Sequence, residues 1–168
     1  VHSSLDDEAV AWSWFCGHCA APSPGGDAPA PNARVCRSCG LGLLLETRED
    51  TAPGPNDAFL VVDASLRVHA LSERAEELLG VREDLVVNRP LAELLVPADV
   101  EGARNGEIAA AVADAVGSGD RPSYSFVRPW NTYGVRVRAR IVTCGPPRAA
   151  LIVLEGPRPG RLHAVTLI

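Results

Sequence analysis

The stretch DAFLVVDASLRVHALSERAEELLGVREDLVVNRPLAELLVPADV, residues 57–100, decides the fold of the larger part of the chain. It opens with an apolar run over residues 58–63, and after a short turn a second strand-like run covers residues 67–71, which together predict a β-hairpin. Ser72 is a residue type that caps helix N-termini, and Gly80 is one that ends helices. The stretch therefore predicts a hairpin followed directly by a helix.

The remainder of this part of the chain predicts further helices and then strands. A short helix is expected at residues 90–95, started by a proline and stopped by the proline at 97. A longer helix is expected at residues 105–119, where apolar residues recur at four-residue spacing. These apolar residues are Ile108, Val112 and Val116. The chain then continues with three strand-like segments, SYSFVRP (123–129), YGVRVRARIVT (133–143) and AALIVLE (149–155).

The order of these elements over residues 57–155 resembles the PAS domain family. The resemblance rests on the first hairpin, on SERAEELLG followed by VREDLVVNRPLAELLVPAD, and on the sequence of two strands, three helices and three strands. Family members usually carry Asn where Ser72 stands, and serine can cap the same helix. The resemblance implies an α+β fold, with a five-stranded antiparallel sheet, helices on one face, and a cavity between them that in some members holds haem, flavin or a small metabolite.

Two of these cofactors are not expected here. The flavin-photosensor run Asn-Cys-Arg is absent, because no cysteine occurs between residues 40 and 143. Residues 98–119 contain no histidine that could ligate haem iron. His69 is expected to be a partly exposed strand residue rather than a ligand. The identity of any small-molecule ligand stays open.

Four cysteines near the N-terminus carry the strongest site signal in the sequence. Cys16, Cys19, Cys36 and Cys39 form the pattern C-x2-C-x16-C-x2-C, a spacing typical of a structural zinc site. A redox dithiol, two disulfides or a four-thiolate iron centre are the alternatives. His18 is expected to be an exposed turn residue, because four thiolates already complete the site.

The segment around these cysteines resembles zinc-ribbon modules and, more loosely, zinc fingers of the Ran-binding-protein type. The insert between the two pairs, rich in Pro, Gly and Ala, has too little hydrophobic mass to fold alone, so the metal is expected to form its core. Glycines at 17 and 40 suit the two tight turns. The aromatic residues Trp12, Trp14 and Phe15 are expected to pack locally, and the alternative is that they pack over the site or against the next domain.

These patterns divide the chain into four predicted parts. Residues 1–46 form a zinc ribbon with an N-terminal extension, and residues 47–56, charged and then rich in Pro and Gly, form a linker. Residues 57–156 form the PAS-like sensor domain, and residues 157–168 a C-terminal tail.

The charge is distributed unevenly along the chain. All 16 basic residues are arginines, and residues 121–168 carry a net charge of +7 while residues 1–56 carry −4. In one predicted strand, Arg136, Arg138 and Arg140 alternate with apolar residues, which places the three guanidinium groups on the outer sheet face. This face is a candidate interaction surface for a second copy of the chain, for a partner protein, or for the acidic segments at residues 6–8 and 48–50.

The sequence therefore predicts a non-enzymatic sensory or regulatory protein, located in the cytoplasm, that signals through a protein partner or a homodimer. No catalytic constellation is recognisable, and a four-cysteine site leaves zinc no open position for water. Cys144 is expected to be buried and inert. The alternative is a transcription-associated nucleic-acid-binding protein that uses the ribbon and the arginine strand. Nucleic acid is not the expected partner, because the ribbon segment is acidic, and no apolar run is long enough to cross a membrane.

Overall fold

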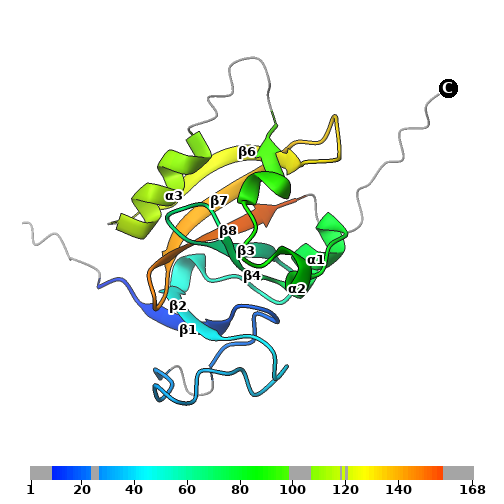
Figure 1. Cartoon of the computed structure of the whole chain (residues 1–168). Helices are drawn as coiled ribbons and strands as arrows, with labels where there is room; N and C mark the ends of the chain where they lie inside the picture. The colour runs from blue at the N-terminus through cyan, green and yellow to red at the C-terminus, as the bar shows by residue number, and fades with distance from the viewer. Residues whose placement is uncertain (1–8, 24–26, 99–106, 118, 120, 157–168) are drawn as a thin grey trace, which may run out of the picture.

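The computed structural model describes residues 9–23, 27–98, 107–117, 119 and 121–156, and this part of the chain forms two antiparallel sheets (Figure 1). The small sheet pairs β1 (Trp12–Cys16) with β2 (Leu44–Arg48). The large sheet has the strand order β4-β3-β8-β7-β6-β5. Its strands are β3 (Ala58–Val62), β4 (Val68–Leu71), β5 (Leu95–Pro97), β6 (Ser123–Pro129), β7 (Val137–Cys144) and β8 (Ala149–Glu155).

Short helices connect the strands in the described part of the chain. The α-helices are α1 (Glu73–Leu79), α2 (Glu83–Val86) and α3 (Glu107–Gly117), and the 3-10 helices are η2 (Glu49–Thr51) and η3 (Leu91–Glu93). The predicted helix after Ser72 is confirmed as α1, with the Ser72 hydroxyl accepting a hydrogen bond from the Ala75 N–H and Gly80 in the left-handed conformation at φ 64°. Helix α2 was not anticipated from the sequence.

The α+β, PAS-like fold is confirmed, with an antiparallel sheet that carries its helices on one face. The sheet has six strands in the described residues rather than the five expected. The helix predicted at residues 90–95 contracts to the single turn of η3, and residues 95–97 pair with β6 instead. Two prolines explain the difference, because only one helical turn fits after Pro90 and the residue before Pro97 is held in the extended region.

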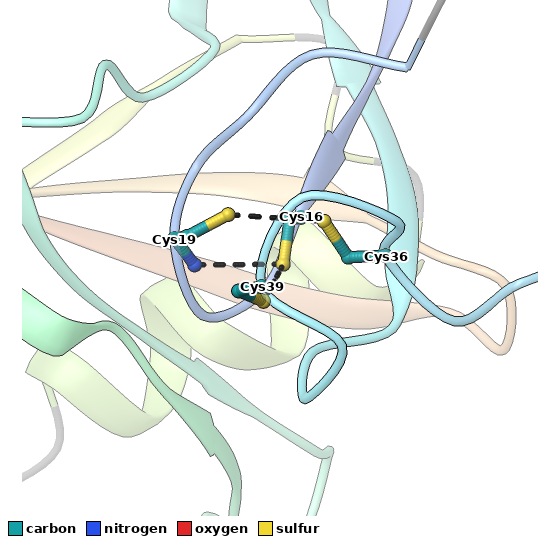
Figure 2. Close-up of side chains that lie close together, drawn as sticks. All are labelled: Cys16, Cys19, Cys36 and Cys39. Atoms are coloured by element: carbon teal, nitrogen blue, oxygen red, sulfur yellow. Dashed lines mark hydrogen bonds between the residues drawn. The ribbon is translucent and has the colours of Figure 1, made fainter.

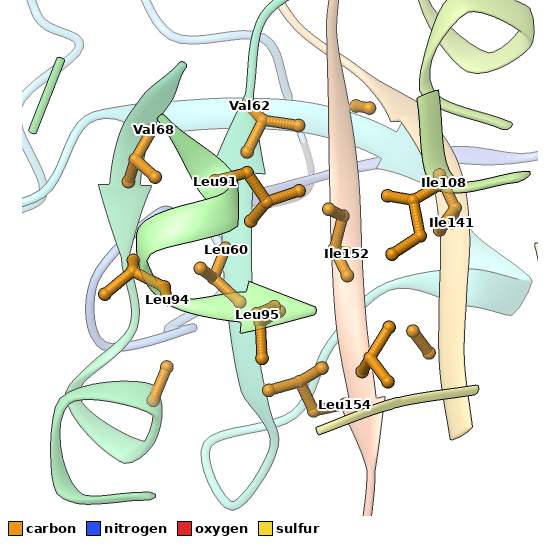
Figure 3. Packing of buried hydrophobic residues seen from close by; sticks show 14 of the residues in the cluster. Leu60, Val62, Val68, Leu91, Leu94, Leu95, Ile108, Ile141, Ile152 and Leu154 are labelled. Carbon is orange, nitrogen blue, oxygen red and sulfur yellow. The ribbon is translucent and has the colours of Figure 1, made fainter. Parts of the chain in front are cut away.

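The helices bury the inner face of the large sheet (Figure 3). Alternate residues of β3, β7 and β8 point to this side. Three of them, Leu60, Ile141 and Ile152, are no more than 1% exposed. Helix α3 contributes Ile108 and Val112, as the four-residue spacing predicted. This cluster forms the core between the sheet and the helices.

The N-terminal hairpin and its loops, residues 12–48 and here called the ribbon, cover part of the opposite, outer face. Phe15 and Leu45 of the ribbon pack in one buried cluster with residues on the outer face of the large sheet, including Phe59, Val61 and Leu151. Figure 1 shows β1 and β2 beneath the sheet, on the side away from α3. Strands β3 and β8 are therefore covered on both faces, which explains why AFLVV and AALIVL are continuously apolar instead of alternating.

The segment predicted as a linker lies against the sheet. Thr47, still within β2, is fully buried and its hydroxyl donates to the carbonyl oxygen of Thr143 at 2.8 Å. Glu46 exchanges two backbone hydrogen bonds with Gly145, at 2.5 and 3.0 Å. Residues 1–8 and 157–168, the predicted extension and tail, lie outside the described residues. None of the helices described here is both long and apolar enough to span a membrane.

Replacing Ser72 by alanine tests how strongly this fold depends on one buried hydroxyl. The hydroxyl oxygen accepts hydrogen bonds from the N–H groups of Phe59 (2.9 Å) and Ala75 (3.1 Å), so Ser72→Ala leaves a buried β3 donor and the α1 cap unpaired. We expect the free energy of unfolding to fall by about 2–3 kcal/mol, measured by urea denaturation.

Ser65→Ala is the matched control, since Ser65 is exposed and its hydroxyl makes none of the hydrogen bonds seen in the described part of the chain. Its effect should stay within about 0.5 kcal/mol. Equal losses for the two variants would contradict the role assigned to Ser72.

Candidate metal centre

The four predicted cysteine ligands converge at one point of the ribbon (Figure 2). Cys16 lies at the end of β1, Cys19 in the turn that follows, and the second pair lies in the turn before β2. Their sulfur atoms all lie within 4.8 Å of one another. The Sγ atoms of Cys16 and Cys39 are 3.7 Å apart, and those of Cys19 and Cys36 are 3.8 Å apart.

These separations suit a tetrahedral metal ion. Metal–sulfur bonds of about 2.3 Å in a regular tetrahedron place the sulfur atoms about 3.8 Å apart. A disulfide bond would need about 2.05 Å, so the cysteines are free thiols in this structure. The four cysteines therefore form a cluster that can bind a metal ion through sulfur alone.

Backbone N–H groups in both turns point at the sulfur atoms. The N–H groups of His18 and Cys19 lie 3.3 and 3.4 Å from the Sγ of Cys16, and the Gly42 N–H lies 3.5 Å from the Sγ of Cys39. Such donors stabilise thiolates, the form in which cysteine binds metals. Gly40 has φ +69°, the left-handed conformation expected for the end of the second turn.

The two cysteine pairs differ in the acidity of their thiols. Burial raises the pKa of Cys16 and of Cys19 above the ordinary thiol value. Burial also works against the thiolate of Cys36, but the backbone N–H groups of Cys39 and Ser38, together with the neighbouring thiols, lower its pKa to about 7. The pKa of Cys39 is lowered in the same way. Backbone N–H donors therefore favour the thiolate form of the second pair.

Gly42 is a site residue that the sequence analysis missed. A Cβ atom added there would overlap the Sγ of Cys16 and would lie 2.8 Å from the Cβ of His18. The same addition at Gly17 meets only ordinary contacts, at 3.4 Å or more. The available signal was the repeated glycine in CGLG, where only the first glycine was assigned a role.

Apolar residues of the ribbon hold the cysteine cluster and attach it to the sheet. Trp14 and Leu44 pack around Cys16 and Cys36, both of which are buried. Phe15 turns to the other side and meets Phe59 of β3 edge to face, with ring centroids 5.7 Å apart. Trp14 therefore packs at the cysteine cluster and Phe15 against the large sheet, which is the alternative to the local packing that the sequence favoured, while Trp12 is 48% exposed.

His18 is not the exposed turn residue that the sequence suggested. Its side chain is only 13% exposed, and Nδ1 lies 3.2 Å from the carbonyl oxygen of Leu71. The carbonyl oxygen of His18 accepts a hydrogen bond from the N–H of Glu73 at 2.9 Å. This N–H is one of the otherwise unpaired donors at the start of α1, so the first cysteine turn docks on that helix terminus.

The arginine strand is only partly as predicted. Arg138 and Arg140 project from the outer face of β7, where Arg140 donates to Glu155 at 2.6 Å and to the carbonyl oxygen of Thr51 at 3.3 Å. Arg140 therefore contacts the segment that follows the ribbon, whereas Arg138 is exposed. The acidic residues 6–8, proposed as a second docking segment, lie outside the described residues.

Exposed aromatic rings lie beneath the other arginines of this face. Arg138 stacks on Tyr124 at 3.9 Å and Arg136 on Phe126 at 3.8 Å, measured from the guanidinium carbon to the ring centroid. We call these four residues the arginine–aromatic patch. Cys144, by contrast, is buried under the ribbon, and burial raises its pKa to about 12, as expected for an inert thiol.

No protein-family model and no curated protein matches this chain. The chain is similar to the solved photoactive yellow protein domain of the sensor histidine kinase Ppr from Rhodospirillum centenum, with a TM-score of 0.44 and 19% identity, covering 60% of this chain and 85% of that one. It is also similar to a chain of the E. coli DhaR(N)–DhaL complex, with a TM-score of 0.41 and 12% identity, covering 61% of this chain and 32% of that one. Both likenesses are weak, and the PAS-like assignment rests on the strand order and helix placement described above.

Substitution of Gly42 tests the geometry of the cysteine cluster. Gly42→Ala forces a methyl group into the position next to Cys16, so we expect metal affinity to fall about tenfold or more, measured by competition with a chromophoric chelator. Gly17→Ala is the matched control and should retain affinity within about threefold, because its added methyl meets ordinary contacts. Wild-type affinity in Gly42→Ala would show that the cluster does not need this close approach.

Proposed function

We propose that this chain is a non-enzymatic regulatory module in which a zinc ribbon is fixed on the outer face of a PAS-like sensor domain. The observation that carries the proposal is the position of the ribbon, which shares one buried cluster with the sheet and docks the first cysteine turn on α1. A ribbon placed in this way links the metal site to a sensor-type fold.

Zinc is the metal that fits the donor set best. Four cysteine sulfurs with tetrahedral separations are typical of closed structural zinc sites, and a closed site has no open position for a catalytic water. An iron centre would need the same ligands, so metal analysis distinguishes the two. The role proposed for the zinc is to stabilise the ribbon and the face of the sheet beneath it.

The sensor domain is proposed to pass its signal to a partner protein, or to a second copy of the chain, through direct contact. The arginine–aromatic patch lies on the half of the outer face that the ribbon leaves open, with Tyr124 50% and Phe126 42% exposed. Arginine and aromatic residues are enriched at the centres of protein interfaces. Nucleic acid is the weaker candidate, because both rings are already stacked under guanidinium groups instead of being free for bases.

Metal analysis of the protein, purified without added metal and under reducing conditions, tests the zinc site. We expect one zinc ion per chain, and we expect Cys39→Ser to lose it, to become protease-sensitive between residues 20 and 43, and to unfold at lower denaturant concentration. Cys144→Ser is the matched control and should keep its zinc. Absence of bound metal in the wild type, or cysteines paired as disulfides, would contradict the proposal.

Charge reversal in the arginine–aromatic patch tests the contact surface. If two copies meet there, Arg138→Glu should shift sedimentation velocity toward the monomer, because it places a carboxylate beside Glu155 in the interface. Arg82→Glu, at an exposed site on α2's N-terminal side, should leave self-association unchanged. A dimer that survives Arg138→Glu would exclude this surface as the site of self-association.

A further inference from the structure

The first cysteine turn, residues 16–19, is the part of the ribbon that meets the edge of the large sheet. Strand β4 lies at that edge and leads directly into α1, which begins at Glu73 (Figure 1). The carbonyl oxygen of His18 accepts a hydrogen bond from the Glu73 N–H at 2.9 Å. The ring nitrogen Nδ1 of His18 lies 3.2 Å from the carbonyl oxygen of Leu71, the last residue of β4. One residue of the turn therefore contacts both elements.

The shape of this turn depends on the sulfur atom of Cys16. The N–H groups of His18 and Cys19 point at this sulfur, at 3.3 and 3.4 Å, so His18 faces the sulfur with its N–H and α1 with its carbonyl oxygen. A metal ion that binds the sulfur fixes its position, and the N–H groups bonded to the sulfur are oriented with it. The direction of the His18 carbonyl group is therefore tied to the state of the cysteine cluster.

Helix α1 is completed at its first residue by this contact with the ribbon. The first N–H groups of a helix have no acceptor within the helix itself. The cap residue Ser72 accepts a hydrogen bond from the Ala75 N–H, and the Glu73 N–H is bonded to the ribbon instead. The hydroxyl of Ser72 also accepts a hydrogen bond at 2.9 Å from the N–H of Phe59 in β3.

The same helix packs into the core on the inner face of the sheet. Ala75 is fully buried and Leu79 is 8% exposed, and both belong to the cluster between the sheet and the helices. A change in order at the start of α1 therefore reaches the inner core. This is the side of the sheet on which the PAS resemblance implies a ligand cavity.

A carboxylate of α2 supports the same junction through a separate contact. Glu83 accepts a hydrogen bond from the Leu71 N–H at 2.8 Å, and the same oxygen, Oε2, lies 3.7 Å from Nδ1 of His18. The Glu83 N–H is in turn bonded to a carboxylate oxygen of Glu76 in α1 at 3.2 Å. The junction thus has a backbone contact at Glu73 and a side-chain contact at Glu83, and each can be removed without changing a cysteine.

We propose that the first cysteine turn couples the metal occupancy of the cysteine cluster to helix α1, so that metal binding is itself a signal to the PAS-like domain. The inference rests on the proposed function, because it requires a metal ion in the cluster, and it adds a regulatory role to the stabilising one. Such coupling is reciprocal: if metal binding orders the contact with α1, then loss of that contact must weaken metal binding by the same factor.

Glu73→Pro tests the backbone contact, because it removes the bonded N–H and is compatible with the helix. Proline is favoured at the first position of a helix, and Ser72 before it has ψ 155°, the extended backbone that a following proline requires. Zinc affinity of the full chain is measured under reducing conditions by competition with a chromophoric chelator. We expect it to fall about fivefold in Glu73→Pro, the effect of one hydrogen bond. Glu73→Ala is the matched control, since it keeps the N–H, and should stay within about twofold of the wild type.

Glu83→Ala tests the side-chain contact and leaves the backbone of α1 unchanged. It removes the acceptor of the Leu71 N–H and the carboxylate beside His18, so we expect zinc affinity to fall about threefold. Glu83→Gln keeps an acceptor for the same N–H and should recover most of the affinity.

Hydrogen exchange tests the coupling in the opposite direction. We expect removal of zinc by a chelator to accelerate exchange of the Ala75 amide in α1 about tenfold more than that of the Val112 amide in α3, measured by NMR. Both residues are fully buried in the inner core, so Val112 reports any loss of stability that the whole domain shares. In Glu73→Pro the difference between the two amides should shrink.

Three results would overturn the inference: zinc affinity unchanged in both Glu73→Pro and Glu83→Ala, equal losses of affinity in Glu73→Pro and Glu73→Ala, or equal acceleration of exchange at Ala75 and Val112. Each of them would leave the zinc site in place with a stabilising role alone. A wild-type chain without bound metal would instead contradict the proposed function before any variant is compared, so the two failures are distinguishable.

Discussion

Two strands that are apolar on both faces impose the main constraint on this structure. Every residue of β3 is buried, and β8 is buried up to its last residue. Helices on one face of the sheet can shield only half of these side chains from water. Burial of each large apolar side chain stabilises the fold by about 1.5–3 kcal/mol. The ribbon supplies the second cover, with Phe15 and Leu45 seated on the outer side of the same strands. The sheet and the ribbon therefore depend on each other.

The ribbon has only a small core of its own, so under the proposed function a bound metal ion would stabilise it as a cover. Its own buried cluster contains just Cys16, Cys36 and Leu44, with a few partly buried neighbours. Structural zinc contributes on the order of 10–16 kcal/mol of apparent binding free energy in small finger peptides, several times the burial of one aromatic side chain. The turn that carries His18 then meets the N-terminus of α1 through the bond from Glu73. The cysteine cluster is thereby connected through short contacts to a helix of the PAS-like domain.

The elements that local sequence determines were predictable, and those that distant contacts determine were not. Ser72 and Gly80 mark the ends of α1, and the cysteine spacing identified the four clustered residues, because caps and ligand pairs are short-range features. Strand β5 depends on pairing with β6, and the burial of His18 depends on a surface more than 50 residues away. The unbroken apolar run of β3 was a visible signal that both faces are covered, but no local pattern indicates which segment covers them.

The ribbon also divides the outer face into two halves with different chemistry. Over β3, β8 and the end of β7 the face is apolar and covered, whereas over β6 and the start of β7 it presents arginines stacked on aromatic rings. Stacking shields the apolar ring faces from water while the guanidinium groups stay solvated, so this half stays hydrated without a cover. Arg140 lies at the boundary, bonded to Glu155 and to the carbonyl oxygen of Thr51. Any partner that approaches the outer face therefore meets the open half, and the position of the ribbon limits how far it can extend across the sheet.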